Sequence, residues 1–416
     1  RLFLRSHGSG NVVYCSCRGR GTRPAKQRNV WGNAMDLSLK DRYTAARRRI
    51  IDDFFSRMNP MQKQAVYTLN GPVLILAGAG SGKTTVIINR IANMVLFGDA
   101  YHSDWMPEQV TAEDVAFLEE YADGESWDSD RAFTLIRSHT VMPWNILAIT
   151  FTNKAAGELK ERLSVRLGPA AEDVWASTFH SACVRILRRD IDRLGFGKDF
   201  TIYDTDDSKR VVRDILKEMN LDEKAFQPRA VLSVISASKD RYESPEDFAR
   251  AHSNEADWKM SRIAKVYAAY AKKLRAANAL DFDDIIYHTV TLLRQERSVL
   301  EYYQRKFRYV LVDEYQDTNH LQYLLTSLLA GGYKNLCVVG DDDQSIYRFR
   351  GANIENILSF EKQYKNARTI RLEQNYRSTQ NILDAANAVI QNNTGRKGKT
   401  LWTDNGAGET VTVKTT

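Results

Sequence analysis

The chain has 416 residues, 43% of them hydrophobic, and a formal net charge of +7. This composition excludes a chain that is disordered throughout, and the length allows two or three domains. The positive balance is compatible with an acidic polymer as partner but does not require one, and the absence of a run of about eighteen apolar residues predicts no membrane span.

The first segment, residues 1–34, carries seven Lys or Arg and no acidic side chain, and it lacks the apolar stretch of a secretory signal. We expect residues 1–40 to be a basic tail that is disordered or not native, with a true start at Met35 as one explanation.

Four cysteines are too few for a disulfide framework, which indicates a reducing compartment. Cys15 and Cys17 have no second pair at zinc-ligand spacing, so surface thiols are the simpler interpretation and a zinc site the alternative.

The first helix is predicted over residues 37–58 from its apolar spacing, and Asn59-Pro60 then resembles an N-cap followed by proline at the first helical position. The short apolar run 73–76 predicts a buried strand, and a glycine-rich loop and a helix over 82–97 follow it. Residues 99–130 hold eleven Asp or Glu and no Lys or Arg, which favours a solvated surface insertion that does not touch nucleic acid.

A further buried strand is predicted at 146–150, and strands are also predicted at 309–312, 336–339 and 369–372. Residues 205–300 are mainly helical in pattern, and their basic clusters are typical of a solvated helix face. Strands separated by helices predict an α/β fold with a parallel, doubly wound sheet. Ligands of such sheets bind at the carboxyl ends of the strands, and each of the motifs below follows a predicted strand.

The segment AGAGSGKT, residues 77–84, lies between a predicted strand and a predicted helix. Its glycines allow a tight turn that aims backbone N–H groups at phosphate oxygens, and the helix N-terminus favours the same anion. We expect Lys83 to reach the β- and γ-phosphates of ATP and the Thr84 hydroxyl to bind Mg²⁺. The general P-loop pattern has glycine where Ala77 stands, and a glycine-rich turn that binds nothing is the alternative.

Two adjacent carboxylates, Asp313 and Glu314, follow the predicted strand 309–312. We expect Asp313 to hold Mg²⁺ and Glu314 to orient or deprotonate the attacking water. An Asp-Glu pair after a strand is a weak signal alone, but the P-loop strengthens it because phosphoryl transfer needs both a cation clamp and a positioned nucleophile. Gln344 also follows a strand, where its amide either senses the γ-phosphate or is one polar side chain of a turn.

Seven motifs in order resemble those of the bacterial UvrD/PcrA/Rep family of superfamily 1 DNA helicases: AGAGSGKT, TFTNKAA, STFHS, LDFDDI, VDEYQDT, VVGDDDQSIYRFRGA and EQNYRS. The stretch MNPMQKQAV, residues 58–66, resembles the Q motif of that family, and the whole resemblance spans about residues 58–404. It implies an ATP-driven motor that moves 3′ to 5′ on single-stranded DNA and acts at single/double-strand junctions in repair or replication. It also implies a cytoplasmic protein associated with the nucleoid.

The resemblance implies the domain organisation as well. A RecA-like P-loop domain, 1A, would consist of residues 41–190, with the acidic insertion 99–130, and residues 281–368. The helical insertion 1B would occupy residues 191–280, and residues 369–416 would begin a second RecA-like domain, 2A. Because the chain ends soon after the EQNYRS motif, we expect most of 2A, the last two motifs and a second arginine finger to be missing, and this polypeptide alone to be a weak ATPase.

Carried over motif by motif, Gln62 would recognise adenine, Tyr376 would stack on the base, and Arg377 would be an arginine finger, a group that contributes about 10³–10⁵ in rate. The implied catalytic residues are Lys83, Glu314, Gln344 and Arg377, and the implied Mg²⁺ ligands are Thr84 and Asp313. The implied ATP-binding residues are Gln62, Ala77, Gly78, Ala79, Gly80, Ser81, Gly82, Lys83, Thr84, Thr85, Tyr376 and Arg377.

Proteins that bind single-stranded DNA combine a basic groove with aromatic side chains on which bases stack. The resemblance implies stacking by Phe151, Tyr347 and Phe349, and the family often has Trp where Phe349 stands, so its stacking is expected to be weaker. Aromatic side chains near strand ends are more often core residues, and His180 is equally compatible with a packing role. The implied DNA-binding residues are Phe151, Thr152, Asn153, Thr178, His180, Tyr347, Phe349 and Arg350.

Two other functions are compatible with these motifs. A RecB/AddA-like helicase-nuclease would carry a nuclease domain with clustered carboxylates beyond Thr416, although the compact motif at 338–352 favours the simpler family. A truncated module would bind ATP and DNA without turnover.

Overall fold

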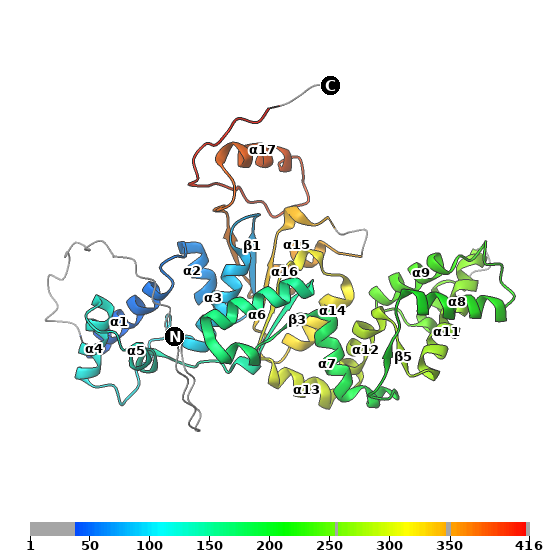
Figure 1. The fold of residues 1–416 in the computed structure, drawn as a ribbon, viewed down its shortest axis with the longest axis horizontal. Coiled ribbons are helices and arrows are strands. Elements are labelled where there is room, and N and C mark those ends of the chain that lie inside the picture. The colour runs from blue at the N-terminus through cyan, green and yellow to red at the C-terminus, as the bar shows by residue number, and fades with distance from the viewer. Residues whose placement is uncertain (1–37, 254–256, 347–350, 413–416) are drawn as a thin grey trace, which may run out of the picture. The chain divides into compact units, whose positions relative to one another are not determined.

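The computed structural model describes residues 38–253, 257–346 and 351–412, and Figure 1 shows the fold. The chain forms two compact units. The first contains the chain up to Leu69 together with Thr84–Ile146 and Gly157–Trp175, and the second contains Asn70–Lys83, Leu147–Ala156 and the chain from Ala176 onward.

A six-stranded sheet forms the centre of the second unit, with the strand order β3-β2-β6-β7-β1-β8. Strand β1 pairs in parallel with β7 on one side and β8 on the other, and β6 pairs in parallel with β7. Every residue of β1, β2, β6 and β7 is buried, as expected for parallel strands covered on both faces. The strands are β1 (Val73–Ala77), β2 (Ile146–Thr150), β3 (Trp175–Thr178), β6 (Tyr309–Val312), β7 (Leu336–Gly340) and β8 (Arg368–Leu372).

The predicted α/β fold with a parallel sheet is therefore confirmed, and so are the five predicted strands. Strand β3 was missed because its sequence, WAST, has no apolar run. Strand β8, which the sequence analysis places at the beginning of 2A, pairs with β1 in this sheet. The domain boundaries predicted from the sequence stay predictions.

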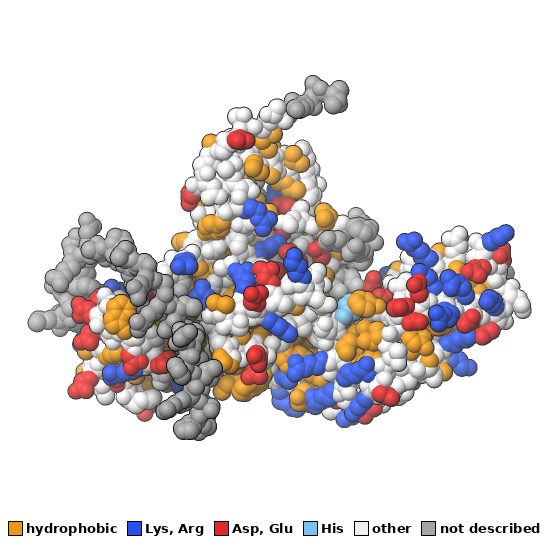
Figure 2. Space-filling model, in the orientation of Figure 1, with side chains coloured by type: hydrophobic (Ala, Val, Ile, Leu, Met, Phe, Trp, Pro, Cys, Tyr) orange, Lys and Arg blue, Asp and Glu red, His pale blue; other side chains and the backbone are white. Residues whose placement is uncertain are grey.

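Helices of the second unit fall into two groups. Helix α12 packs against α7 and α14 beside the sheet, whereas α8, α9, α10 and α11 enclose a core of their own around Val212, Phe226 and Tyr267. Over this second group Lys and Arg side chains are interspersed with Asp and Glu, as Figure 2 shows. The helices are α7 (Phe179–Asp190), α8 (Thr205–Glu218), α9 (Pro228–Asp240), α10 (Pro245–Ala251), α11 (Trp258–Ala276), α12 (Phe282–Gln295), α13 (Arg297–Lys306), α14 (His320–Ala330), α15 (Glu355–Leu358), α16 (Phe360–Gln363) and α17 (Gln380–Ile390).

Short elements complete the second unit. They are the two-stranded parallel sheet of β4 (Thr201–Ile202) and β5 (Ala279–Leu280), and the 3₁₀ helices η3 (Ile191–Leu194), η5 (Tyr315–Asp317) and η6 (Asp342–Gln344). Helix α12 begins with a capping box in which the side chains of Asp281 and Asp284 each accept a hydrogen bond from the other residue's backbone N–H.

The first unit is helical and includes the acidic segment 99–130, which was expected to be a solvated insertion. That expectation was incomplete, because the segment contains α4, whose Val115 and Leu118 are fully buried. Helix α4 packs against α1, and Arg42 pairs with Glu119 across them. The elements are α1 (Leu39–Phe54), α2 (Pro60–Tyr67), α3 (Lys83–Leu96), α4 (Ala112–Asp123), α5 (Ser129–Ile136), η1 (Pro143–Asn145), α6 (Asn153–Leu167) and η2 (Gly168–Asp173).

In the part of the chain that the structure describes, no helix combines the length and the apolar character needed to cross a bilayer. Cys183 and Cys337 are buried, and neither forms a disulfide among the described residues. The predictions made for Cys15, Cys17 and the basic tail fall on residues outside the described ranges.

Candidate functional site

The phosphate-binding loop predicted from the sequence runs from the end of β1 to the start of α3. Gly80 and Gly82 have φ angles of +68° and +84°, in the left-handed region that glycine adopts without strain. Ser81 stabilises the turn, since its buried hydroxyl donates a 2.8 Å hydrogen bond to the carbonyl of Gly78. The loop conformation therefore depends on the glycine spacing of the motif.

Lys83 and Glu314 meet at the carboxyl end of the sheet. The Lys83 ammonium donates a 2.9 Å hydrogen bond to Oε2 of Glu314, and the two side chains are 13% and 39% exposed. Glu314 has a φ of +48° and a ψ of +44°, a conformation that costs energy for a residue with a side chain. Residues 231 positions apart in sequence are thus brought together as predicted.

Asp313 lies next to this pair and is half-buried. Desolvation and the neighbouring Glu314 raise the pKa of Asp313 to about 6, against the hydrogen bond from the Glu314 backbone N–H and the charge of Lys83. A carboxylate with a raised pKa beside a second carboxylate suits a divalent cation, which would stabilise its ionised form. Thr84 follows Lys83 in the chain and lies in the first turn of α3, as a Mg²⁺ ligand on a P-loop helix would.

Gln316 is a site residue that the sequence interpretation missed. Its side-chain Nε2 donates a 3.0 Å hydrogen bond to Oε2 of Glu314, and its Oε1 accepts one of 2.9 Å from the backbone N–H of Asp341. It is 2% exposed. Gln316 therefore connects Glu314 to the segment that carries Gln344. Its place two residues after Glu314 in VDEYQDT was the available signal.

Gln344 lies at the end of η6 and is exposed. Its amide donates a short hydrogen bond to Oδ2 of Asp341, and its backbone N–H donates one of 3.0 Å to the Asp341 carbonyl. Gln344 and Ala79 of the phosphate-binding loop line the same pocket of about 490 Å³, which Leu401 and residues of α17 also line. The structure thus brings Gln344 to the same pocket as the P-loop.

The motif EQNYRS contacts the phosphate-binding loop directly. Asn375 Nδ2 donates a 2.6 Å hydrogen bond to the carbonyl of Ala79, and the backbone N–H of Tyr376 donates one of 2.9 Å to the carbonyl of Gly80. A Cβ added to Gly80 would lie 2.8 Å from Cβ of Arg377. Tyr376 is 49% exposed, and its hydroxyl donates a 2.9 Å hydrogen bond to Gln374. Tyr376 and Arg377 are therefore held against the loop that was predicted to bind phosphate.

Two residues predicted to contact ATP have local roles in the first unit. Gln62 is 4% exposed and forms a capping box with Asn59 at the start of α2. Thr85 accepts a 3.0 Å hydrogen bond from Arg162. Their contacts with nucleotide stay predictions.

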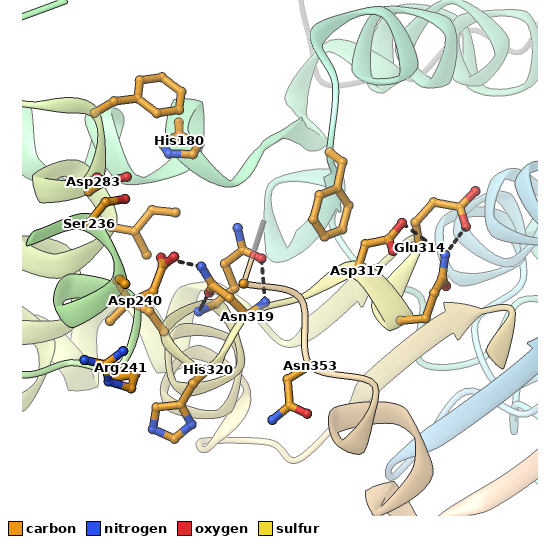
Figure 3. Close-up of a pocket in the computed structure, with 18 of the residues that line it drawn as sticks. His180, Ser236, Asp240, Arg241, Asp283, Glu314, Asp317, Asn319, His320 and Asn353 are labelled. Atoms are coloured by element: carbon orange, nitrogen blue, oxygen red, sulfur yellow. Dashed lines mark hydrogen bonds between the residues drawn. The ribbon is translucent and has the colours of Figure 1, made fainter. Parts of the chain in front are cut away.

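A second pocket, of about 1130 Å³, contains predicted DNA-binding residues (Figure 3). It is lined by Phe151, Thr152 and His180. Phe151 packs edge-on against Phe179 with ring centroids 5.5 Å apart. His180 stacks on Phe282 at 3.7 Å, and burial lowers its pKa to about 4, so the ring is neutral at pH 7.

Phe282 is the second residue that sequence interpretation missed. It lines the same pocket and is 58% exposed, an unusual position for an aromatic side chain that only packs. LDFDDI was recognised as a motif, but no role was given to its Phe. Phe282, His180 and Phe151 together give this pocket aromatic walls.

The remaining predicted DNA contacts divide into three cases. Asn153 is exposed at the start of α6. Thr178 is 7% exposed and caps α7, because its Oγ1 accepts a 3.3 Å hydrogen bond from the Ser181 N–H. Tyr347, Phe349 and Arg350 lie outside the described residues.

Carboxylates also line this pocket. Asp240, labelled in Figure 3, accepts a 2.6 Å hydrogen bond from Asn319 Nδ2. Burial and the neighbouring Asp283 raise the pKa of Asp240 to about 7, against the charge of Arg241. When Asp240 is partly protonated, this side of the pocket repels a polyanion such as DNA less than it would with the carboxylate fully charged.

Comparison with known proteins decides the family. Residues 58–104 and 129–365 match the UvrD/REP helicase N-terminal domain, and residues 370–416 match the UvrD-like helicase C-terminal domain. The chain belongs to the UvrD/REP helicase family. Residues 105–128, which contain α4, lie outside these matches.

Several proteins similar to this chain share the name ATP-dependent DNA helicase PcrA. The chain is 51% identical over 359 residues to the ATP-dependent DNA helicase PcrA of Bacillus subtilis, an alignment that covers 86% of this chain and 43% of the relative. It is 49% identical over 356 residues to PcrA of Staphylococcus aureus, with 86% and 43% covered, and 49% identical over 354 residues to PcrA of Staphylococcus epidermidis, with 85% and 42% covered. The chain thus spans less than half the length of these UvrD/REP relatives.

Proposed function

We propose that the protein is an ATP-dependent DNA helicase that moves 3′ to 5′ on single-stranded DNA and separates strands at junctions. The observation that carries this proposal is the 2.9 Å contact between Lys83 of the phosphate-binding loop and Glu314. A cation for the phosphates and a carboxylate for the attacking water are thereby held at one end of the sheet, as ATP hydrolysis requires. The PcrA relatives are named ATP-dependent DNA helicases, which supports the same reading.

In this mechanism, Lys83 binds the β- and γ-phosphates and leaves its pairing with Glu314 as they enter. Glu314 then accepts a proton from the water that attacks the γ-phosphorus, while the bond from this phosphorus to the β–γ bridging oxygen breaks and ADP leaves. Thr84 and Asp313 would hold Mg²⁺, whose charge stabilises the negative oxygens of the transferring group. Gln316 keeps Glu314 oriented through its 3.0 Å hydrogen bond.

Residues of two further motifs complete the proposed nucleotide site. Gln344 senses the γ-phosphate, and Arg377 stabilises the charge that develops on it. Tyr376 stacks on the adenine that Gln62 recognises. The contacts of residues 375–377 with the phosphate-binding loop support this arrangement.

We propose that single-stranded DNA lies against the aromatic pocket. Phe151 and Phe282 stack on bases, and the exposed Thr152 and Asn153 contact phosphates near them. Thr178 contributes to DNA binding indirectly, because it caps α7. His180 also contributes indirectly, because it stacks on the ring of Phe282. Tyr347, Phe349 and Arg350 remain proposed contacts.

The proposed organisation assigns residues 41–190 and 281–368 to domain 1A and residues 191–280 to the insertion 1B. Residues 369–416 are assigned to 2A, as its beginning. Because its proposed substrate is DNA, we propose that the protein acts in the cytoplasm and associates with the nucleoid.

ATP turnover with and without single-stranded DNA tests the function. The full-length protein should hydrolyse ATP faster when DNA is added, and Lys83→Ala should abolish turnover. It should unwind a duplex with a 3′ tail and leave a matched 5′-tailed duplex intact. Turnover that DNA does not change would exclude a DNA motor, and nucleotide binding without hydrolysis would favour a binding module.

A further inference from the structure

The three consecutive carboxylates of η6 and its N-cap surround one lysine. Lys399 Nζ lies 2.6 Å from Oδ1 of Asp341 and 2.7 Å from Oδ2 of Asp343, and it also donates to Oδ1 of Asp342. The Lys399 side chain is 1% exposed. Among the described residues, these three carboxylates are close enough together to hold a metal ion, but the lysine ammonium takes that place. The cluster is therefore an internal ion-pair network.

A second cation comes from the same segment. Arg396 donates two 2.7 Å hydrogen bonds to the carboxylate of Asp343, and it donates a third, of 2.8 Å, to the backbone carbonyl of Lys399. The backbone N–H of Lys397 donates a 2.7 Å hydrogen bond to Asp342. Residues 396–399 thus hold the whole Asp341–Asp343 turn through side chains and backbone.

The network reaches the proposed catalytic residues through Asp341. One oxygen of its carboxylate pairs with Lys399, and the other accepts the amide hydrogen of Gln344. The backbone N–H of Asp341 donates to Gln316, which in turn donates to Glu314. If Lys399 withdraws, the Asp341 carboxylate loses the cation that fixes it, and Gln344 loses a fixed partner.

We propose that Lys399, supported by Arg396, is a positioning residue that links the segment after α17 to nucleotide sensing by setting the orientation of Gln344. This inference rests on the proposed ATP hydrolysis. Burial alone would lower the pKa of Lys399, but the aspartates raise it above its ordinary value, so the ammonium stays charged. Lys399 touches neither reacting atoms nor nucleotide in this role and acts through Asp341.

The test compares two lysines of one segment in the full-length protein. Lys399→Met would leave three carboxylates, two of them buried, with one cation. The informative variant is therefore Lys399→Met combined with Asp342→Asn, which keeps one uncompensated negative charge in the cluster. The matched control is Lys397→Met, because the Lys397 ammonium pairs instead with Glu361, whose side chain is 49% exposed. Thermal unfolding establishes that both variants fold.

The measurements are kcat for ATP and the ratio of affinities for ADP and a non-hydrolysable ATP analogue. We expect both kcat and that affinity ratio to fall roughly fivefold or more in the variant that combines Lys399→Met with Asp342→Asn. We expect Lys397→Met to change neither quantity. In a Gln344→Ala background the Lys399 change should add nothing, because both act through one side chain. Lys399→Arg should retain part of the wild-type kcat and of the wild-type affinity ratio, because arginine keeps the positive charge.

Three results would overturn the proposal: a Lys399 variant that behaves like Lys397→Met, effects that add fully to Gln344→Ala, or a loss explained by unfolding alone. If the wild-type protein binds nucleotide but shows no turnover, the proposed function fails. The affinity ratios and the Gln344→Ala comparison then still decide whether Lys399 positions Gln344.

Discussion

Lys239 and Asp281 form an ion pair inside the second unit, with Nζ 2.6 Å from Oδ2 and side chains only 3% and 10% exposed. The same ammonium lies 2.7 Å from Asp284, so one cation serves the two acids that cap α12. Burial alone would lower the pKa of Lys239, but the two aspartates raise it well above its ordinary value. The start of the helix that carries Phe282 thus depends on a buried charge.

Lys239→Met should therefore destabilise the fold by about 3–5 kcal/mol, because it leaves uncompensated buried carboxylates. Urea unfolding measures the change. The matched control is Lys272→Met, since Lys272 is exposed on α11 and its loss should change stability by about 0.5 kcal/mol or less. Equal effects for the two variants would contradict the structural role of the pair.

Glu314→Gln should retain ATP binding and reduce hydrolysis by about 10²–10⁴-fold, because glutamine keeps the shape of the side chain but accepts no proton. Fluorescent-nucleotide titration and a single-turnover assay separate the two effects. The control is Glu301→Gln, since Glu301 pairs with Arg297 on the surface of α13. Normal turnover in Glu314→Gln would remove Glu314 from its proposed role.

Phe282→Ala should weaken binding of single-stranded DNA by about 1–3 kcal/mol, the usual contribution of one aromatic–base stack, and leave ATP affinity unchanged. Fluorescence anisotropy with a labelled oligonucleotide measures it. Trp127→Ala is the control, because Trp127 is 82% exposed but lies between α4 and α5, in the segment without a family match. Equal losses for both aromatic residues would point to a nonspecific effect.

The raised pKa of Asp240 predicts that the stability of the fold depends on pH. Its pKa is about 7 in the folded protein and near 3.8 when unfolded, so between these values the folded state binds more protons. Stability should therefore fall as pH rises from about 4 to 7 through this group. Asp240→Asn should remove that part of the slope in chemical denaturation at pH 5 and pH 8. The surface variant Asp192→Asn should keep it, and an unchanged slope in Asp240→Asn would refute the assignment.

The strands and the P-loop could be predicted because their signals are local. The run Val73–Ala77 is apolar throughout, and the glycine spacing of residues 78–82 dictates the turn that follows. Pairing of Lys83 with Glu314 also followed from sequence, because parallel strands place their carboxyl ends at one edge.

The missed features depend on partners far apart in the chain. Lys399 stands in GRKGK, a sequence typical of an exposed basic loop, and only the distant Asp341–Asp343 turn allows its burial. Phe282 is an ordinary helix N-terminal residue until α7 brings His180 against its ring. Strand β8 was predicted as a strand, but its partner β1 could not be read from its own residues.

The left-handed backbone of Glu314 sets stability against activity. A glycine there would adopt the same φ without the cost of about 1–2 kcal/mol that a side chain incurs, which offsets part of the loss of the contacts with Lys83 and Gln316. Screens that select only for thermal tolerance should therefore retain Glu314→Gly, whereas selection for growth that needs the motor should eliminate it.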